Sequence, residues 1–590
     1  MKKVSPIKLA AYSGFSLVLV YLFYYLNRVD VSLTYFWQQS IPISVSESLR
    51  IPGGLSALLA DLMLEATIRL VFGSILFALL LTVVFFSLKT IFRKESGKPL
   101  FYPLLIASLI PFIFSFSQYR LPFELITSVA AGLLMGVLYS YCLPRKLGPG
   151  LLCSFLAAIL VFVVAGIPGL TVLLQVLIIQ ALLSGRYKDL IFLIPILILP
   201  LLYLPFNLAV SVKQAYLGSF LVSEYDEIPR AFYFSLTSPL LLLMGLLILN
   251  SVFSKLAPKP SLFVSSVALV MVLVVLGYST NTSFDEAEKN GYAIVQASFD
   301  KDWDKVFELT KEASSYNNLV QFIVNRALNG TGILLDEMFR YPQLFGETGI
   351  FLDGFASSQI SIHTAAFYYD LGFANETRHW ATEAQMVLVR HPIVLKQLVM
   401  SYIAIGQEGT ALTYLRVLSG SRLYREWSDH VFMMLKNNEA GEDPDIRFFR
   451  SNNPDKDFFA GTKDPVKKLA FFYRYNKDNN MAFELLLAGY LLKHNIGAVV
   501  FLLPEFRNQG FEKFPIAVEE ALMIYLARTG TSLSSLTDYS ISKSTLERFN
   551  DFSKLIANVD SQAERMKRVS KYKNTYWYYI LFSSPYASKK

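Results

Sequence analysis

A succession of long apolar runs occupies the first part of the chain, and the last of them covers residues 262–278. Mixed, charged sequence then continues to residue 590. No charged residue lies between Lys259 and Asp285. At about 1.5 Å per helical residue, this interval is long enough to cross a lipid bilayer. We therefore expect a membrane domain over residues 1–278 and a soluble domain over 279–590.

The composition favours the same class of protein. Apolar residues make up 53% of the chain and charged residues 17%, which is too apolar for a soluble protein of this length. Both cysteines, Cys142 and Cys153, lie in apolar runs, which excludes a disulfide framework and a CxxC metal site. We attribute much of the net charge of +8 to basic loops that set membrane topology, and we expect no nucleic acid partner.

The apolar runs predict nine transmembrane helices. They are expected over 9–26, 68–88, 100–116, 125–143, 151–167, 170–183, 190–204, 231–253 and 262–278. The fifth and sixth are short and are separated by Gly166-Ile167-Pro168-Gly169. This pair could instead form a re-entrant hairpin.

Basic residues predict the orientation of these helices. Placing the N-terminus in the cytoplasm collects basic clusters on one side, including Arg93, Lys94 and Arg186, whereas the longer loops of the other side hold few bases among many acids. This asymmetry is the one that the positive-inside rule requires. An odd number of spans then places residues 279–590 in the periplasm of a bacterial inner membrane. A re-entrant hairpin would leave this prediction unchanged.

Polar residues of the outer loops are the candidate functional residues. The first loop, 27–67, is longer than a connection requires and places Asp30 just after the first span. Asp61, Glu65 and Arg69 follow at a spacing that predicts one face of a helix. Two later outer loops add Arg120, Glu124, Glu227 and Arg230. These groups could equally form a solvated, salt-bridged rim.

The predicted spans contain few strongly polar residues. No Asp, Glu, Lys or His lies in the middle of a span, whereas ion-coupled transporters use ionisable groups at that depth. A transporter is therefore the third functional interpretation.

Apolar residues recur with a helical period through the soluble part, and strand patterns are scarce. Helices are expected near 284–298, 302–314, 316–328, 332–339, 359–373, 376–390, 393–406, 408–419, 422–436, 464–475, 480–493, 496–507, 515–528 and 543–556. The fold class predicted for the whole chain is therefore all-α.

A repeat is visible within these helices. Tyr368 and Gly372 recur as Tyr402 and Gly406, thirty-four positions later, and small or apolar residues recur after them. Such units resemble tetratricopeptide repeats and predict a solenoid of helical hairpins with a concave surface for protein partners. Ordinary helix packing could also produce small residues at this spacing.

Motifs of common enzymes are absent from the sequence. The chain lacks an HExxH zinc motif, a P-loop, a Rossmann glycine motif and a GxSxG elbow. No cofactor is evident, and a divalent metal is expected only if the protein is a transferase.

Several stretches resemble a family of bacterial, Bacteroidota-type envelope proteins that has no established activity. They are the Pro52-Gly53-Gly54 turn, the segments 292–313 and 325–346, and the repeat segments. The resemblance implies a polytopic N-terminal half followed by a tetratricopeptide-like periplasmic tail.

A wider resemblance, in architecture only, is to GT-C-type glycosyltransferases. These enzymes have a long first outer loop with an acidic residue soon after the first span, where this chain has Asp30, although no DxD or ExD pair is present. The resemblance implies sugar transfer from a polyprenyl phosphate, with Asp30 as base or metal ligand and Asp61 or Glu65 assisting. The residues that would hold the phosphate or substrate are Arg69, Arg120, Glu124, Glu227 and Arg230.

Two functional hypotheses follow. In the first, the protein is an envelope scaffold that is anchored in the lipid bilayer and recruits envelope proteins through its helical repeats. In the alternative, it is the GT-C-like transferase.

Overall fold

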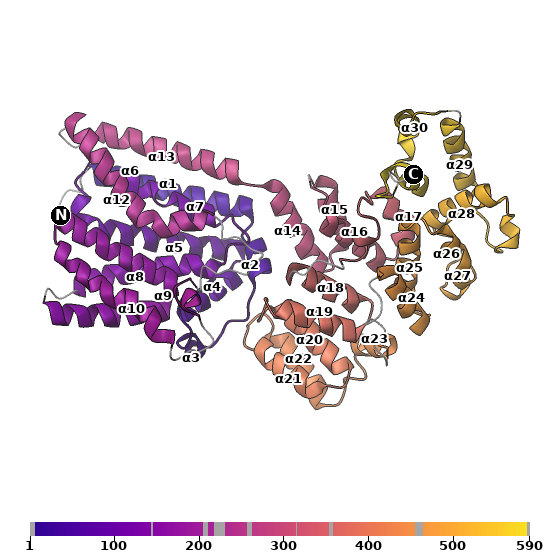
Figure 1. Ribbon diagram of the computed structural model, residues 1–590, viewed down its shortest axis with the longest axis horizontal. Helices are drawn as coiled ribbons and strands as arrows, with labels where there is room; N and C mark the ends of the chain where they lie inside the picture. The colour runs from indigo at the N-terminus through magenta and orange to yellow at the C-terminus, as the bar shows by residue number, and fades with distance from the viewer. Residues whose placement is uncertain are drawn as a thin grey trace. The chain divides into compact units, whose positions relative to one another are not determined.

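The computed structural model describes residues 6–98, 100–142, 146–204, 211–217, 230–256, 262–313, 315–352, 358–454, 464–557 and 559–586. The chain divides into two compact units, 1–289 and 290–590, which we call the membrane unit and the tail. Every regular element among the described residues is a helix, which confirms the all-α prediction (Figure 1).

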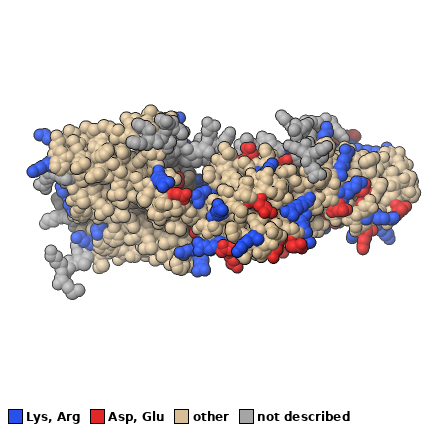
Figure 2. Space-filling model, turned by 90° about the horizontal axis from the view of Figure 1, so that it is seen from below, with Lys and Arg blue, Asp and Glu red and all other residues tan. Residues whose placement is uncertain are grey.

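Among the described residues of the membrane unit, six helices are long and apolar enough to cross a membrane. They are α1 (Pro6–Val29), α5 (Leu70–Ile91), α8 (Phe123–Cys142), α9 (Leu147–Ser184), α12 (Arg230–Leu256) and α13 (Leu262–Ser283). The last of these, α13, packs against α1 and α6, and α12 packs against α7 and α9. Charged side chains are sparse over this unit on the face shown in Figure 2, whereas both signs of charge are mixed over the tail.

Two of the nine predicted spans are shorter or broken. The span expected over 100–116 consists of α6 (Phe101–Ala107) and α7 (Ile110–Ser115), because Pro111 has no N–H to donate to the carbonyl of Ala107. The span expected over 190–204 begins with a 3-10 segment, η2 (Tyr187–Leu193), and continues as the ten-residue helix α10 (Ile194–Tyr203). A further short helix, α11 (Val212–Leu217), follows.

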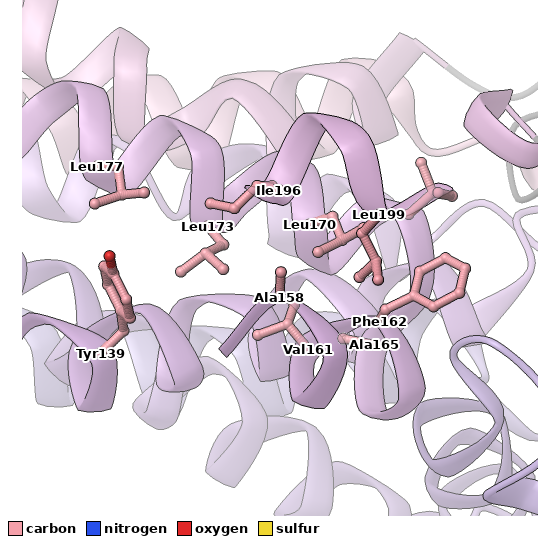
Figure 3. Packing of buried hydrophobic residues seen from close by; sticks show 11 residues of the cluster. Tyr139, Ala158, Val161, Phe162, Ala165, Leu170, Leu173, Leu177, Ile196 and Leu199 are labelled. Carbon is pink, nitrogen blue, oxygen red and sulfur yellow. The ribbon is translucent and has the colours of Figure 1, made fainter. Parts of the chain in front are cut away.

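Helix α9 reverses direction at Gly166, whose φ of 60° and ψ of −153° are not helical. Its two arms, 147–165 and 167–184, face each other through a shared apolar cluster (Figure 3). Both arms also reach the end of α8, where Tyr139 bonds Ser154 of the first arm at 2.5 Å and Ser140 bonds Gln180 of the second. At about 1.5 Å per residue, each arm is about 27 Å long, close to the thickness of the hydrocarbon core.

The segment 53–56 supplies hydrogen-bond donors to this reversal. In a continuous helix, the carbonyls of Phe162 and Val164 would accept from residues 166 and 168, but the chain turns at 166 and residue 168 is a proline. Instead, the N–H of Gly53 donates to Phe162 at 2.9 Å, and the hydroxyl of Ser56 donates to Val164 at 2.8 Å. The Pro52-Gly53-Gly54 turn therefore starts α4 (Gly54–Ala66) directly against the bend of α9.

Within its described part, the tail has α-helices close to the predicted positions and three that were not predicted, over 444–452, 562–568 and 576–578. They are α14 (Glu286–Phe299, which begins in the membrane unit), α15 (Trp303–Glu312), α16 (Asn318–Gly330), α17 (Leu334–Glu337), α18 (Ser358–Asp370), α19 (Ala374–Gln385), α20 (Pro392–Ala404), α21 (Glu408–Leu418), α22 (Arg425–Lys436), α23 (Pro444–Asn452), α24 (Pro465–Tyr475), α25 (Asn480–Leu492), α26 (Ile496–Phe501), α27 (Glu505–Asn508), α28 (Ile516–Thr529), α29 (Lys543–Ile556), α30 (Gln562–Arg568) and α31 (Tyr576–Tyr578). The single helix expected over 496–507 is two helices, with Pro504 between them.

The predicted repeat positions lie at helix junctions. Gly372 and Gly406 follow α18 and α20 with φ of +79° and +78°, values that glycine adopts without strain. Helices α18, α19, α20 and α21 pack in sequence, each against the next. The small or apolar residues of the repeat are buried between them, and they are Thr377, Ala384, Ala411 and Leu418.

A buried carboxylate in the tail makes stability depend on pH. Burial raises the pKa of Glu484 from 4.5 to about 7, and the charge of Asp336 adds to the rise. The folded tail therefore binds this proton more tightly than the unfolded chain, so the stability that the proton confers is complete below about pH 4.5 and is lost as the pH rises through about 7.

We expect Glu484→Gln to stabilise the tail at pH 8 by up to about 3 kcal/mol and to change little at pH 5. The measurement is thermal unfolding of the full chain at both pH values. Glu312→Gln is the control, because Glu312 is exposed, and no change of the unfolding temperature is expected for it at either pH. An equal effect of Glu484→Gln at both pH values would contradict the raised pKa of Glu484.

Candidate functional site

The first candidate residue, Asp30, forms the turn between α1 and α2 (Ser32–Gln38). Its φ is 60°, a left-handed conformation that Asp tolerates better than most residues. One of its carboxylate oxygens accepts from the backbone N–H of Ser32 at 3.3 Å and from the hydroxyl of Ser32 at 2.5 Å. The carboxylate of Asp30 thus shapes the start of α2.

The segment 118–123 packs against this turn. The hydroxyl of Tyr119 donates to the carbonyl of Val29, the residue before Asp30. The side-chain amide of Gln38 donates to the carbonyls of Tyr119 and Leu121, both at 2.6 Å, and accepts from the N–H of Phe123 at 3.0 Å. Gln38 and Tyr119, which sequence reasoning did not single out, therefore hold the segments 29–38 and 119–123 together.

Cationic groups gather at the same end of the membrane unit. Arg28 donates to Asn281 at 2.8 Å and lies over the ring of Phe284 at 4.5 Å, and the ammonium of Lys289 donates to the carbonyl of Arg28 at 2.8 Å. Burial raises the pKa of Glu288, and the charge of Arg120 opposes that rise. Of the predicted residues, Asp30 and Arg120 are thus brought to one end of the bundle.

Two more of the predicted residues lie on α4. Asp61 and Glu65 lie one turn apart on α4 and are half-buried. The prediction that Arg69 shares their helical face is wrong, because α4 ends at Ala66 and the exposed Arg69 lies just before α5 with an extended backbone. The side chain of Thr67 ends the helix by donating to the carbonyl of Leu64 at 2.6 Å.

The remaining residues of the set lie at helix starts or outside the structure. Glu124 lies in the first turn of α8, and the exposed Arg230 begins α12. Glu227 lies outside the described residues. Among the described residues, no group of three or more His, Cys, Asp or Glu is placed to hold a metal ion.

The tail contains a cavity of about 380 Å³ between α18, α20 and α22, which we call the tail cavity. One wall is a buried ion pair, in which Arg326 donates to Asp370 at 2.6 Å. Lys301 approaches the same carboxylate at 3.0 Å, and Arg326 also donates to the hydroxyl of Ser298 at 2.9 Å. On this wall, one carboxylate is therefore shared by two cations.

Another part of the tail cavity lining has free hydrogen-bonding capacity. The ammonium of Lys396 lies 4.8 Å from the ring centre of Trp427, and burial lowers the pKa of Lys396. Among the described residues, no carboxylate lies within 4 Å of this ammonium. The neighbouring Gln397 is 6% exposed, and its side-chain oxygen has no hydrogen-bond partner there. A ligand could therefore offer an acceptor to Lys396 and a donor to Gln397.

Acidic residues form the rim of the tail cavity. Asp443 accepts from the N–H of Ile446 at 3.0 Å and starts α23. Burial raises the pKa of Tyr369, and the adjacent Asp445 and Asp370 add to that rise. The missed helix α23 positions these acids. Its sequence did contain a start signal, because Asp443 precedes a proline at the first helical position.

Comparison with known sequences identifies the family. The model of a family described as "Family of unknown function (DUF6057)" matches residues 5–583. The chain belongs to this family. No curated protein and no solved structure matches the chain. The DUF6057 match covers both the membrane unit and the tail, so the two units occur together as one family architecture.

Proposed function

We propose that this DUF6057 protein is a membrane-anchored scaffold that binds an envelope protein partner in its tail cavity. The observation that supports this most directly is the unpartnered pair of Lys396 and Gln397 beside Trp427. Buried polar groups are normally satisfied, so a pair left open inside a cavity fits a binding surface better than a core.

The helical repeats of the tail also fit the role of a scaffold. In our proposal, the hairpins of α18 to α21 are tetratricopeptide-like units of a solenoid, and their concave side is the partner surface. The nine-span topology would place that surface in the periplasm of a bacterial inner membrane.

Site-specific photocrosslinking tests the partner site. A photoreactive amino acid at Met400, which lines the tail cavity, is expected to give a discrete protein adduct in membranes. Lys396→Ala should remove that adduct. A photoreactive residue at the exposed Leu546 is the matched control and should not give it. An adduct that survives Lys396→Ala and Trp427→Ala would contradict the proposed surface.

Cysteine labelling tests the orientation. Cys142 and Ser534 are both exposed, one in the membrane unit and one in the tail. In intact spheroplasts of a Cys153→Ala background, an impermeant maleimide is expected to label Ser534→Cys and to leave Cys142 unlabelled until the membrane is opened. The reverse pattern would place the tail in the cytoplasm.

The transferase alternative has weaker support. The bonds from Asp30 to Ser32 give this carboxylate a structural task at the start of α2. Asp30→Asn keeps an acceptor for Ser32 but removes the charge, so under the scaffold proposal we expect envelope glycans and lipid-linked sugars to stay unchanged. Their loss with normal accumulation of the variant would favour the transferase.

A further inference from the structure

Three segments that are distant in sequence enclose a polar cavity of about 450 Å³ at one end of the membrane unit. It lies where α5, α8 and the second arm of α9 end and η2 begins. We call it the basic cavity, because its charged lining residues are Arg93, Lys94, Arg186 and Asp189.

The positive charge of the basic cavity is only partly compensated. Arg186 and Asp189 pair at 3.3 Å, and both remain accessible to solvent. Arg93 lies 5.1 Å from the ring centre of Tyr141. Among the described residues, Arg93 and Lys94 have no carboxylate within 4 Å, although Lys98 nearby pairs with Glu95. Two cations therefore face this cavity without an internal counter-ion.

Neutral polar groups continue the lining between these cations. Gln180 bonds Ser140 across the two helices, and Ser184 accepts from Arg186 at 3.2 Å. Leu177 and Phe192 close the apolar side of the cavity. The cavity thus joins a cationic mouth to the apolar part of the helix bundle.

We propose that the basic cavity binds the phosphate group of an anionic phospholipid. Guanidinium groups match phosphate oxygens, and a basic pocket at the ends of transmembrane helices lies at the depth of lipid head groups. The acyl chains would then lie along the exposed apolar side chains of the bundle. This inference is independent of the scaffold proposal, because it concerns the membrane unit alone.

A lipid-binding titration of the purified full-length protein in neutral detergent tests this proposal. We expect native mass spectrometry to show specific binding of phosphatidylglycerol and much weaker binding of phosphatidylcholine. Arg93→Gln with Lys94→Gln should weaken phosphatidylglycerol binding by about thirtyfold, which corresponds to about five- to sixfold per cation. In a second arm of the titration, inorganic phosphate is added as a competitor of phosphatidylglycerol. Competition at millimolar levels would identify free phosphate, and not a lipid head group, as the source of the bound phosphate group.

The control removes the same charge from the same end of the unit. Lys98 and Lys188 are basic but do not line the cavity, so Lys98→Gln with Lys188→Gln should leave binding unchanged. Thermal unfolding without lipid shows whether each variant is folded. If the double variant is unstable, Arg93→Lys is tested in its place, because it keeps the charge. Equal weakening by both double variants, equal binding of the two lipids, or no binding of either anion would overturn the proposal.

Discussion

Glu520→Ala is expected to detach the C-terminal segment from the tail and to lower its free energy of unfolding by about 3 kcal/mol. Glu520 is 1% exposed, and its carboxylate accepts from Arg548 and from the backbone N–H of Tyr576, both at 2.7 Å. Its backbone carbonyl accepts from the indole of the fully buried Trp577 at 2.7 Å. Removing the carboxylate leaves a buried N–H and a guanidinium without their acceptor.

Hydrogen exchange resolves this effect along the chain. In Glu520→Ala, amides of 572–583 should exchange faster, whereas those of α18 to α21 should not change. Glu520→Gln keeps an acceptor for Tyr576 and should have a smaller effect. The control is Glu564→Ala, because Glu564 pairs with Arg568 on the surface, where both side chains are about half exposed and such pairs contribute little. Equal effects of Glu520→Ala and Glu564→Ala would contradict the structural role of Glu520.

Helix positions could be predicted from the sequence because they depend on local patterns. The predictions over 359–373 and 393–406 coincide with α18 and α20, where apolar periodicity and the following glycine act together. Prolines also give local information, and the breaks at Pro111 and Pro504 could have been predicted from their missing N–H groups. The opposite error concerns α23, which no predicted helix covers although Asp443, its cap residue, precedes a proline.

The sites could be predicted less well, because tertiary structure assembles them. Lys396 and Trp427 lie on different helices, and only the packing of α20 and α22 around one cavity brings them together. Arg93 and Arg186 were assigned to topology from their positions in loops, and their shared cavity depends on the reversal of α9. Asp30 was singled out by its position after the first span, whereas its hydrogen bonds to Ser32 follow from a left-handed turn.

That reversal is also a position where a single methyl group should have a large effect on the membrane unit. The backbone of Gly166, with φ of 60° and ψ of −153°, lies in a region that only glycine adopts readily. A Cβ atom on Gly166 would lie 3.3 Å from the Cα of Gly53, which itself has a φ of +77°. Neither backbone can move away easily, because Gly53 and Ser56 donate to the carbonyls of the first arm.

Gly166→Ala is therefore expected to lower the stability of the membrane unit by about 3 kcal/mol or more, and Gly166→Val should prevent its accumulation. The measurement is the thermal unfolding midpoint of the full chain in detergent, together with its level in membranes. Gly277→Ala is the matched control, because Gly277 lies in α13 and a Cβ there meets no atom within 4 Å. A helix that continued straight through residue 166 would be stabilised by alanine, so an increase in the midpoint for Gly166→Ala would show that the two arms of α9 do not fold back on each other.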